Sequence, residues 1–191
     1  MTWDKHKKPL SWSAISSFKY DTEQWYQSYV LGIKGTSKQM EFGKEAGSKL
    51  EKDPTFLPSI PRQSVMEYKF HVTFGDIELV GFADSFGECA LREFKTGVSP
   101  WTQEKVDKHH QITMYLLMNY IQNKQLPEAV TCTLHWMPTE EKGDGTIGFK
   151  EPIEEKIQHF TTKRTTKDIL EFAGSIPAII KEMESYAQAH D

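Results

Sequence analysis

Cysteine is scarce in this sequence, because the 191 residues contain only Cys89 and Cys132. Two cysteines cannot build a disulfide framework, a four-cysteine zinc site or a four-cysteine iron–sulfur cluster. Apolar runs are short as well, and none approaches the roughly 20 residues that a membrane-spanning helix needs. The basic start of the chain is followed by no apolar stretch, so no secretory signal is predicted. We therefore expect a cytoplasmic protein without a membrane segment.

Positive charge is also in short supply. The chain has 23 basic against 27 acidic residues, a net charge of −4 at neutral pH, and only three of the basic residues are arginines. A globally basic nucleic-acid-binding protein is therefore excluded, although a local basic patch is not. The charge is uneven, since residues 1–52 carry nine lysines against six acidic residues. Any phosphate contacts would mostly be made by lysine point charges and not by the bidentate guanidinium of arginine.

What is present is the composition of an ordinary folded domain, with 38% apolar, 12% aromatic and 26% charged residues. A length of 191 residues fits a single domain with a substantial core. We expect one domain over 1–191, with N-terminal helices in 1–52 and a sheet core with flanking helices in 64–191.

Helical spacing dominates the first fifty residues and returns in the second half of the chain. Ser11 or Ser13 is a candidate N-cap for a first helix, and Asp21 opens a second helix that stops at Gly32. Pro177 predicts a kink or break in the last helix. The further helices are predicted over 38–52, over 102–122, and from Thr165 or Thr166 to about residue 189.

Alternation of apolar and polar residues predicts a three-stranded antiparallel meander after a proline-containing loop at 53–62. Its strands are expected over 64–74, 77–86 and 89–96. The later strands are expected over 129–137 and 157–162, with a polar turn at 140–148. The whole pattern predicts a mixed α/β fold in which helices cover a sheet.

Two carboxylates and one ammonium group are expected to converge at one edge of this sheet. Glu93 and Lys95 are two residues apart on a strand and so share a face, while Phe94 points to the other face. Asp84 lies on the preceding strand of the hairpin, within cross-strand reach of Glu93. An exposed ion pair of Glu93 with Lys95 and a strand-end role for Asp84 are the alternative interpretations.

Such a group suits metal-dependent hydrolysis of a phosphodiester. Asp84 and Glu93 supply the oxygen ligands that Mg²⁺ or Mn²⁺ prefers, and a divalent cation would offset the repulsion between them. The cation would lower the pKa of a bound water. Lys95 would orient or deprotonate the attacking water, or stabilise the charge that develops on the phosphate.

Five elements in order along the chain resemble the PD-(D/E)XK nuclease superfamily, and more narrowly its RecB-like exonuclease branch, which includes CRISPR-associated and mitochondrial exonucleases. The resemblance covers roughly residues 10–120 and, more loosely, the C-terminal strands and helix. A Glu-x-Lys alone carries almost no information, whereas five elements in order form a specific signature. The matching segments are 10–18 with 25–32, Phe42-Gly43 with Leu50-Glu51, Gly81-Phe-Ala-Asp84, Glu93-Phe-Lys95-Thr-Gly97 and Gln111-Ile-Thr-Met-Tyr115.

This resemblance implies a restriction-endonuclease-like fold and a Mg²⁺- or Mn²⁺-dependent exonuclease that acts on DNA from its ends. Asp84, Glu93 and Lys95 would be catalytic, with the two carboxylates as metal ligands. Gln111 and Tyr115, which share one helix face at positions i and i+4, would contact the DNA. Single-stranded DNA or duplex ends would be the substrate, in DNA repair or recombination or in phage or defence metabolism. A protein partner in such a complex is a further expectation.

The sequence departs from the pattern of this branch at two places. The first motif usually has a metal-binding histidine or glutamate four residues after its glycine, and that position is Gly47 here. Glu51 and Glu67 are candidate substitutes for this ligand, as is Glu45. The iron–sulfur members carry a cysteine near the second helix, where this chain has Asp21. We therefore expect no iron–sulfur cluster.

Two other functions stay open beside the exonuclease. A nuclease-like module with a weakened site would bind DNA or a protein partner, which Gly47 favours, and a structure-selective endonuclease would cut closed circles. The adjacent His109 and His110 diverge by about 100° on a helix, so they are poor candidates for a shared metal ion. The aromatic residues of the first helices are better explained as core than as a base-stacking surface.

Overall fold

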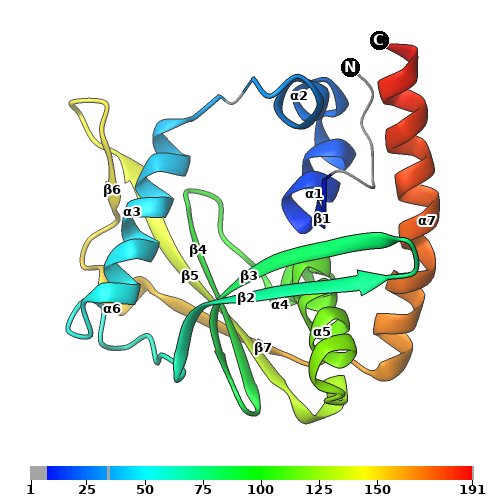
Figure 1. Ribbon diagram of the computed structural model, residues 1–191. Coiled ribbons are helices and arrows are strands. Elements are labelled where there is room, and N and C mark those ends of the chain that lie inside the picture. The colour runs from blue at the N-terminus through cyan, green and yellow to red at the C-terminus, as the bar shows by residue number, and fades with distance from the viewer. Residues whose placement is uncertain (1–7, 34, 191) are drawn as a thin grey trace.

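A mixed seven-stranded sheet lies at the centre of the computed structural model, which describes residues 8–33 and 35–190 (Figure 1). The strands run in the order β1-β3-β4-β5-β6, with β2 paired to β3 and β7 paired to β5. β1 is parallel to β3 and β4 is parallel to β5, and the other pairs are antiparallel. The strands are β1 (Leu10–Ser11), β2 (Val65–Phe74), β3 (Ile77–Gly87), β4 (Ala90–Gly97), β5 (Thr131–Glu141), β6 (Ile147–Phe149) and β7 (Gln158–Thr162).

Most of the helices begin at a polar residue whose side chain accepts a hydrogen bond from a backbone N–H of the first turn. These N-cap residues are Ser11, Asp21, Ser37, Thr102 and Thr165. None of the helices in the described part of the chain combines the length and the apolar character needed to cross a membrane. The helices are α1 (Trp12–Tyr20), α2 (Thr22–Trp25) with the π-helical η1 (Tyr26–Val30), α3 (Lys38–Lys52), α4 (Gln103–Asp107), α5 (His110–Asn123), the 3₁₀ turn η2 (Pro127–Ala129), α6 (Ile153–Lys156) and α7 (Thr166–Ala189).

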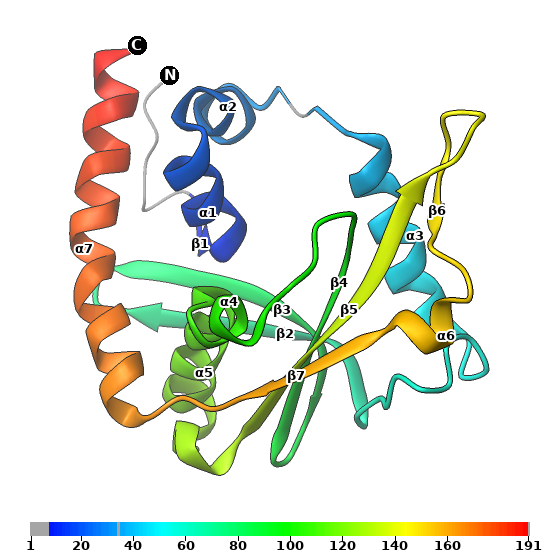
Figure 2. The ribbon, with the colours of Figure 1, turned by 180° about the vertical axis from the view of Figure 1, so that it is seen from behind.

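Helices flank the sheet on both sides. α5 packs against β2 and β3, and α7 packs against α5. Figure 1 shows the β2–β3 hairpin in front of α5, and Figure 2, seen from behind, shows α5 in front of the hairpin. α3 contacts β4 and β6 at the other end of the sheet, above a small core that includes Leu50, Met137 and Ile157. The predicted mixed α/β fold with an N-terminal helical segment is confirmed.

The predicted elements are largely confirmed, and α3 has the predicted bounds. The meander of β2, β3 and β4 is also present as predicted. The polar turn expected at 140–148 is present but shorter than predicted, because β5 continues to Glu141 and pairs in a hairpin with β6, which begins at Ile147. The break expected at Pro177 was wrong. α7 continues through this proline because its apolar face is buried along its length, and tertiary packing outweighs local propensity.

β3 and β4 pair only at their joined ends. Their ladder runs from Gly87 opposite Ala90 to Ser85 opposite Arg92 and stops there. β2 occupies one edge of β3 along its whole length, so β1 and β4 share the other edge. Between the rung to β1, which ends at Val80, and the rung to β4, the edge of β3 is open. This opening carries the whole Gly81-Phe-Ala-Asp84 segment.

Gly81 lets α5 approach β3 closely. A Cβ atom at this position would lie 2.6 Å from Met118 Cε and 2.7 Å from Tyr115 Cε1, which is closer than real Cβ contacts. Any larger residue would therefore push α5 away from the sheet. The glycine of the motif thus sets the height at which Tyr115 sits above β3.

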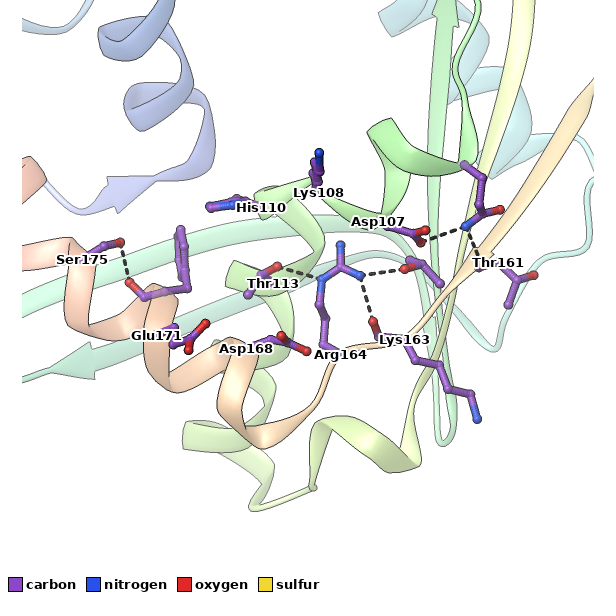
Figure 3. Close-up of a pocket in the computed structure, with 13 residues that line it drawn as sticks. Asp107, Lys108, His110, Thr113, Thr161, Lys163, Arg164, Asp168, Glu171 and Ser175 are labelled. Carbon is purple, nitrogen blue, oxygen red and sulfur yellow. Dashed lines mark hydrogen bonds between the residues drawn. The ribbon is translucent and has the colours of Figure 1, made fainter.

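Arg164 explains why the helix predicted over 102–122 is instead two helices. This side chain is 4% exposed and lies between β7, α4 and α5 (Figure 3). It donates to the carbonyl oxygens of Val106 at 3.0 Å and His109 at 3.3 Å, and to the hydroxyls of Thr113 at 2.9 Å and Thr162 at 2.7 Å. A guanidinium at the C-terminal end of α4 satisfies carbonyls that a broken helix leaves free.

We expect Arg164→Lys to lower the free energy of unfolding by about 3 kcal/mol, because one ammonium cannot replace several buried guanidinium hydrogen bonds. Chemical denaturation would measure the loss. Lys163→Gln is the matched control, since an exposed neighbour should change stability by no more than about 0.5 kcal/mol. Equal stability of Arg164→Lys and the unsubstituted protein would contradict this role.

Candidate active site

The candidate site begins where β3 and β4 separate. Asp84 and Glu93 are the first residues beyond the last paired rung, Ser85 with Arg92. Asp84 Oδ2 accepts a hydrogen bond from the backbone N–H of Phe94 at 2.6 Å. The carboxylate thereby replaces a strand partner that the opened ladder no longer supplies, and it holds Asp84 beside Glu93.

Glu93 and Lys95 form a buried ion pair. Lys95 Nζ donates to Glu93 Oε1 at 2.6 Å and to Gln111 Oε1 at 2.8 Å. Glu93 is 2% exposed, so the alternative of an exposed surface pair is wrong. An ammonium group has three donors, and two of those of Lys95 are accounted for. The third is available to the cavity that Lys95 lines.

Gln111 is fixed by hydrogen bonds from both sides. Its Nε2 donates to Tyr115 Oη at 2.8 Å, and Tyr115 Oη donates to the Phe82 carbonyl at 2.5 Å. His109 Nε2 lies 3.1 Å from Gln111 Oε1. Because a carbonyl oxygen only accepts, His109 must carry its proton on Nε2. The chain of contacts therefore fixes the amide orientation of Gln111, and with it the position of Lys95.

Burial and mutual repulsion disfavour the charged forms of both carboxylates. Burial, followed by the negative charge of Glu93, raises the pKa of Asp84 to about 8. Burial also raises the pKa of Glu93, although Lys95 opposes this shift. For Lys95, burial acts to lower the pKa, but Glu93 and Asp84 outweigh it and the pKa is raised. Lys95 is therefore an ammonium cation that offsets only part of the negative charge.

The donor set fits a hard divalent cation. Glu93 Oε2 is buried and has no hydrogen-bond partner among the described residues, and an orphaned carboxylate oxygen is costly without a cation or donor. Asp84 supplies a second oxygen donor close by. Within 8–33 and 35–190, no three His, Cys, Asp or Glu side chains converge enough to hold an ion by themselves. In proteins Mg²⁺ is usually bound by one or two carboxylates and keeps several of its waters.

A cavity of about 410 Å³ opens onto this group, and α3 forms one of its walls. Gly43 and Gly47, one helical turn apart, line it together with Asp84 and Lys95. A Cβ atom at Gly43 would lie 3.1 Å from Thr96 Oγ1, so this glycine lets α3 approach β4. No atom lies within 4 Å of a Cβ built at Gly47. Gly47 therefore leaves open space directly beside the carboxylate of the site.

Of the three glutamates considered as substitutes for a ligand at position 47, two lie near Asp84 and one does not. Glu51 and Glu67 both line a neighbouring cavity of about 450 Å³ that also reaches Asp84. The β2–β3 ladder skips Glu67, between Met66 opposite Ser85 and Tyr68 opposite Ala83. Glu67 has a positive φ of 52°, a conformation that is uncommon for residues other than glycine. Glu45 is instead paired with Lys49 at 2.8 Å on the exposed side of α3.

Two of the residues considered as DNA contacts or ligands point elsewhere. Tyr115 is 4% exposed, and its hydroxyl is used by Gln111 and the Phe82 carbonyl. His110 lines a separate cavity of about 650 Å³ between α5, β7 and α7, which Figure 3 shows. Arg164 also lines this second cavity. Neither Asp84 nor Glu93 does, so the larger cavity lies apart from the carboxylate pair.

His109 is a site residue whose contact with Gln111 the sequence did not indicate. Burial lowers its pKa to about 4, so the ring is neutral at pH 7. It lies between two tryptophan rings, at 5.8 Å from Trp12 and 4.9 Å from Trp101 between ring centres. No local pattern announces this role, because it arises from the break between α4 and α5, which has no Pro or Gly to mark it.

No family model matches this sequence, and no curated protein matches it. The chain is similar to the crystal structure of a candidate exonuclease from Eubacterium rectale, with a TM-score of 0.58 and 10% identity over 97% of this chain and 84% of that chain. It is also similar to an alkaline exonuclease from Laribacter hongkongensis, with a TM-score of 0.48 and 12% identity over 95% and 90% of the two chains. The first similarity confirms the predicted fold class, a sheet flanked by helices consistent with a restriction-endonuclease-like core. The chemistry has to be argued from the side chains.

Neutralising Asp84 tests whether the site is built for a cation. We expect Asp84→Asn to raise the free energy of unfolding of the metal-free protein at pH 7 by about 1 kcal/mol. With its pKa raised to about 8, Asp84 must take up a proton on folding or be buried as a repelled charge, and the amide avoids both costs. Mg²⁺ or Mn²⁺ should raise the Tm of the unsubstituted protein and leave that of Asp84→Asn unchanged. Thermal unfolding with EDTA and with each metal measures both effects.

Glu182→Gln on the exposed side of α7 is the matched control and should show neither effect. A metal response of equal size in the unsubstituted protein and in Asp84→Asn would contradict a cation site at this carboxylate.

Proposed function

We propose that this protein is a metal-dependent deoxyribonuclease of the PD-(D/E)XK type that hydrolyses phosphodiester bonds. The observation that carries the proposal is the convergence of Asp84, Glu93 and Lys95 beside an open cavity, with one buried carboxylate oxygen left without a partner. The order of these residues on a separating strand pair matches the signature in the sequence. The similarity to a candidate exonuclease from Eubacterium rectale supports the same conclusion.

Asp84 and Glu93 would hold the metal, which is Mg²⁺ or Mn²⁺ by the hard-oxygen chemistry of these donors. When bound, such a metal supplies Lewis-acid stabilisation of phosphate charge and a water of lowered pKa. Glu51 and Glu67 line the cavity on the other side of Asp84 and are the further candidates for contacts to metal-bound water. No iron–sulfur cluster is part of the proposal.

Lys95 has the geometry of an electrostatic catalyst. Hydrolysis forms a bond from a water oxygen to phosphorus and breaks the bond from phosphorus to a sugar oxygen, so negative charge grows on the phosphate. The ammonium of Lys95 is held by Glu93 and Gln111, with a third N–H free toward the cavity. It would donate to a phosphate oxygen or orient the water. Its raised pKa argues against the alternative role of a general base.

Gln111 and Tyr115 act together as a positioning pair in this proposal. Gln111 touches Lys95 directly, and Tyr115 fixes Gln111 through a hydrogen bond whose other end is the Phe82 carbonyl. The hydroxyl of Tyr115 thereby links the helix to the strand that carries Asp84. Gln111 is the more exposed member of the pair and would be the one to meet a DNA strand.

An exonuclease that enters from DNA ends is the form of activity we favour. The RecB-like signature and the similarity to the Eubacterium rectale structure both support it. A closed circular substrate distinguishes the two activities, because only a structure-selective endonuclease would cut it. A role in DNA repair, recombination, phage or defence metabolism, with or without a protein partner, is the biological setting that the resemblance suggests.

The activity is tested on end-labelled linear single-stranded DNA with Mn²⁺, next to a closed single-stranded circle and an EDTA lane. We expect cleavage of the linear strand alone, abolished by EDTA. Lys95→Ala and Asp84→Asn should each lower the rate by at least about 100-fold. Lys181→Ala, which removes an exposed lysine from α7, is the matched control and should leave the rate unchanged.

Asp84→Asn keeps this test decisive even if Lys95→Ala is poorly folded, because the amide removes a carboxyl group whose ionisation is disfavoured in the folded protein. Cleavage of the circle at the same rate would assign an endonuclease. No cleavage of any substrate by folded protein would sink the enzymatic proposal and leave the DNA- or partner-binding module, which Gly47 favours.

The open space at Gly47 allows a gain-of-function test. We expect Gly47→Glu to lower the Mn²⁺ concentration for half-maximal activity about tenfold, because it adds a carboxylate beside Asp84. Gly174→Glu is the matched control, since Gly174 is also a helical glycine with open space around its Cβ. Both variants gain helix propensity, but only Gly47→Glu should change the metal titration. An identical titration for the two variants would refute a ligand position at Gly47.

A further inference from the structure

Phe82 is an exposed aromatic side chain beside the candidate site. It lies in the middle of β3, two residues before Asp84, and it is 51% exposed. Residues two apart on a strand share a face, so the ring and the Asp84 carboxylate project from the same side of β3. A half-exposed Phe at the centre of a strand is an apolar surface, and no ring contact of Phe82 is seen within residues 8–33 and 35–190.

The same rung of the sheet carries a cation. Lys69 of β2 pairs directly with Phe82, is exposed, and makes no hydrogen bond or ion pair among the described residues. Figure 1 shows the β2–β3 hairpin in front of α5, with no described helix or strand covering this side. A ring and an ammonium group therefore lie side by side on an open face, two residues along β3 from Asp84.

The spacing suits one nucleotide. Two residues along a strand span about 6.6 to 6.8 Å, close to the phosphate-to-phosphate repeat of an extended single strand. Single-stranded nucleic acid is bound through base stacking on aromatic rings and phosphate contacts to cations, and this rung offers one of each. Two residues farther from Asp84 the pattern does not continue. There His71 lies opposite Val80, and its Nε2 is 2.8 Å from the carboxylate of Glu78.

We propose that Phe82 and Lys69 form a binding subsite for the nucleotide adjacent to the phosphate held at Asp84. The base stacks on Phe82, and its phosphate meets Lys69. The subsite is one nucleotide long and accepts any base, since stacking does not depend on base edges. This proposal rests on the proposed nuclease function. It adds the path of the bound DNA, which runs along β3 from Asp84 toward Phe82, away from the residues at which β3 pairs with β4.

Binding is measured by fluorescence anisotropy of a labelled single-stranded oligonucleotide, in the Asp84→Asn background with EDTA so that the strand stays intact. We expect Phe82→Ala to weaken binding about tenfold, as one lost base–aromatic stack does, and Phe82→Trp to restore it. Leu170→Ala is the matched control, because Leu170 is 59% exposed on α7. It should leave the affinity unchanged.

An oligonucleotide of abasic sites separates stacking from other effects. The tenfold loss in Phe82→Ala should disappear on this strand, because it has no bases to stack. Lys69→Ala should weaken binding to both strands and reduce the slope of log affinity against log salt by about 0.7. Lys181→Ala, the charge control on α7, should leave that slope unchanged.

The outcomes distinguish this subsite from the nuclease proposal. If the unsubstituted protein cleaves DNA and Phe82→Ala binds both oligonucleotides as tightly as its background, the subsite is wrong and the nuclease proposal stands. An equal loss on the normal and abasic strands would also overturn it, because it would show that the ring does not meet a base. If folded protein neither binds nor cleaves DNA, the nuclease proposal itself fails, and the subsite fails with it.

Discussion

The separation of β3 and β4 beyond the Ser85–Arg92 rung is the constraint on which the rest of the structure depends. Opening a ladder leaves backbone groups that need new partners. Asp84 accepts the N–H of Phe94, and Tyr115 donates to the carbonyl of Phe82. The residues that satisfy the opened backbone are therefore those that form the candidate site or hold its parts in place. The same two hydrogen bonds thus stabilise the opened strands and position the residues of the candidate site.

The opened strands create a site whose charges are unbalanced within the protein. Glu93 is buried with one oxygen bound to Lys95 and one without a hydrogen-bond partner among the described residues. Asp84 adds a second carboxylate whose charged form is disfavoured by burial and by Glu93. Such an arrangement costs folding free energy, because buried charge is left partly uncompensated. Carboxyl groups with raised pKa values of this kind are typical of functional sites.

α3 contributes two glycines, and no carboxylate, to the cavity beside Asp84. Its glycine at position 43 brings the helix close to Thr96, while the glycine at position 47 leaves the cavity without a third carboxylate at that point. Glu51 and Glu67 border Asp84 from the neighbouring cavity. The proposed nuclease activity therefore depends on whether two carboxylates with water suffice to hold the metal. The free space at position 47 allows this to be tested by substitution.

The sequence by itself determined the helix of 38–52, the meander, and the meeting of Asp84, Glu93 and Lys95, because strand alternation and hairpin order act over a few neighbouring residues. It could not show that 102–122 breaks, since the carbonyls at the break are satisfied by Arg164 from a segment more than fifty residues away. The contact of His109 with Gln111 follows from that break. Only the tertiary structure decided these features, because burial and long-range hydrogen bonds override local propensity.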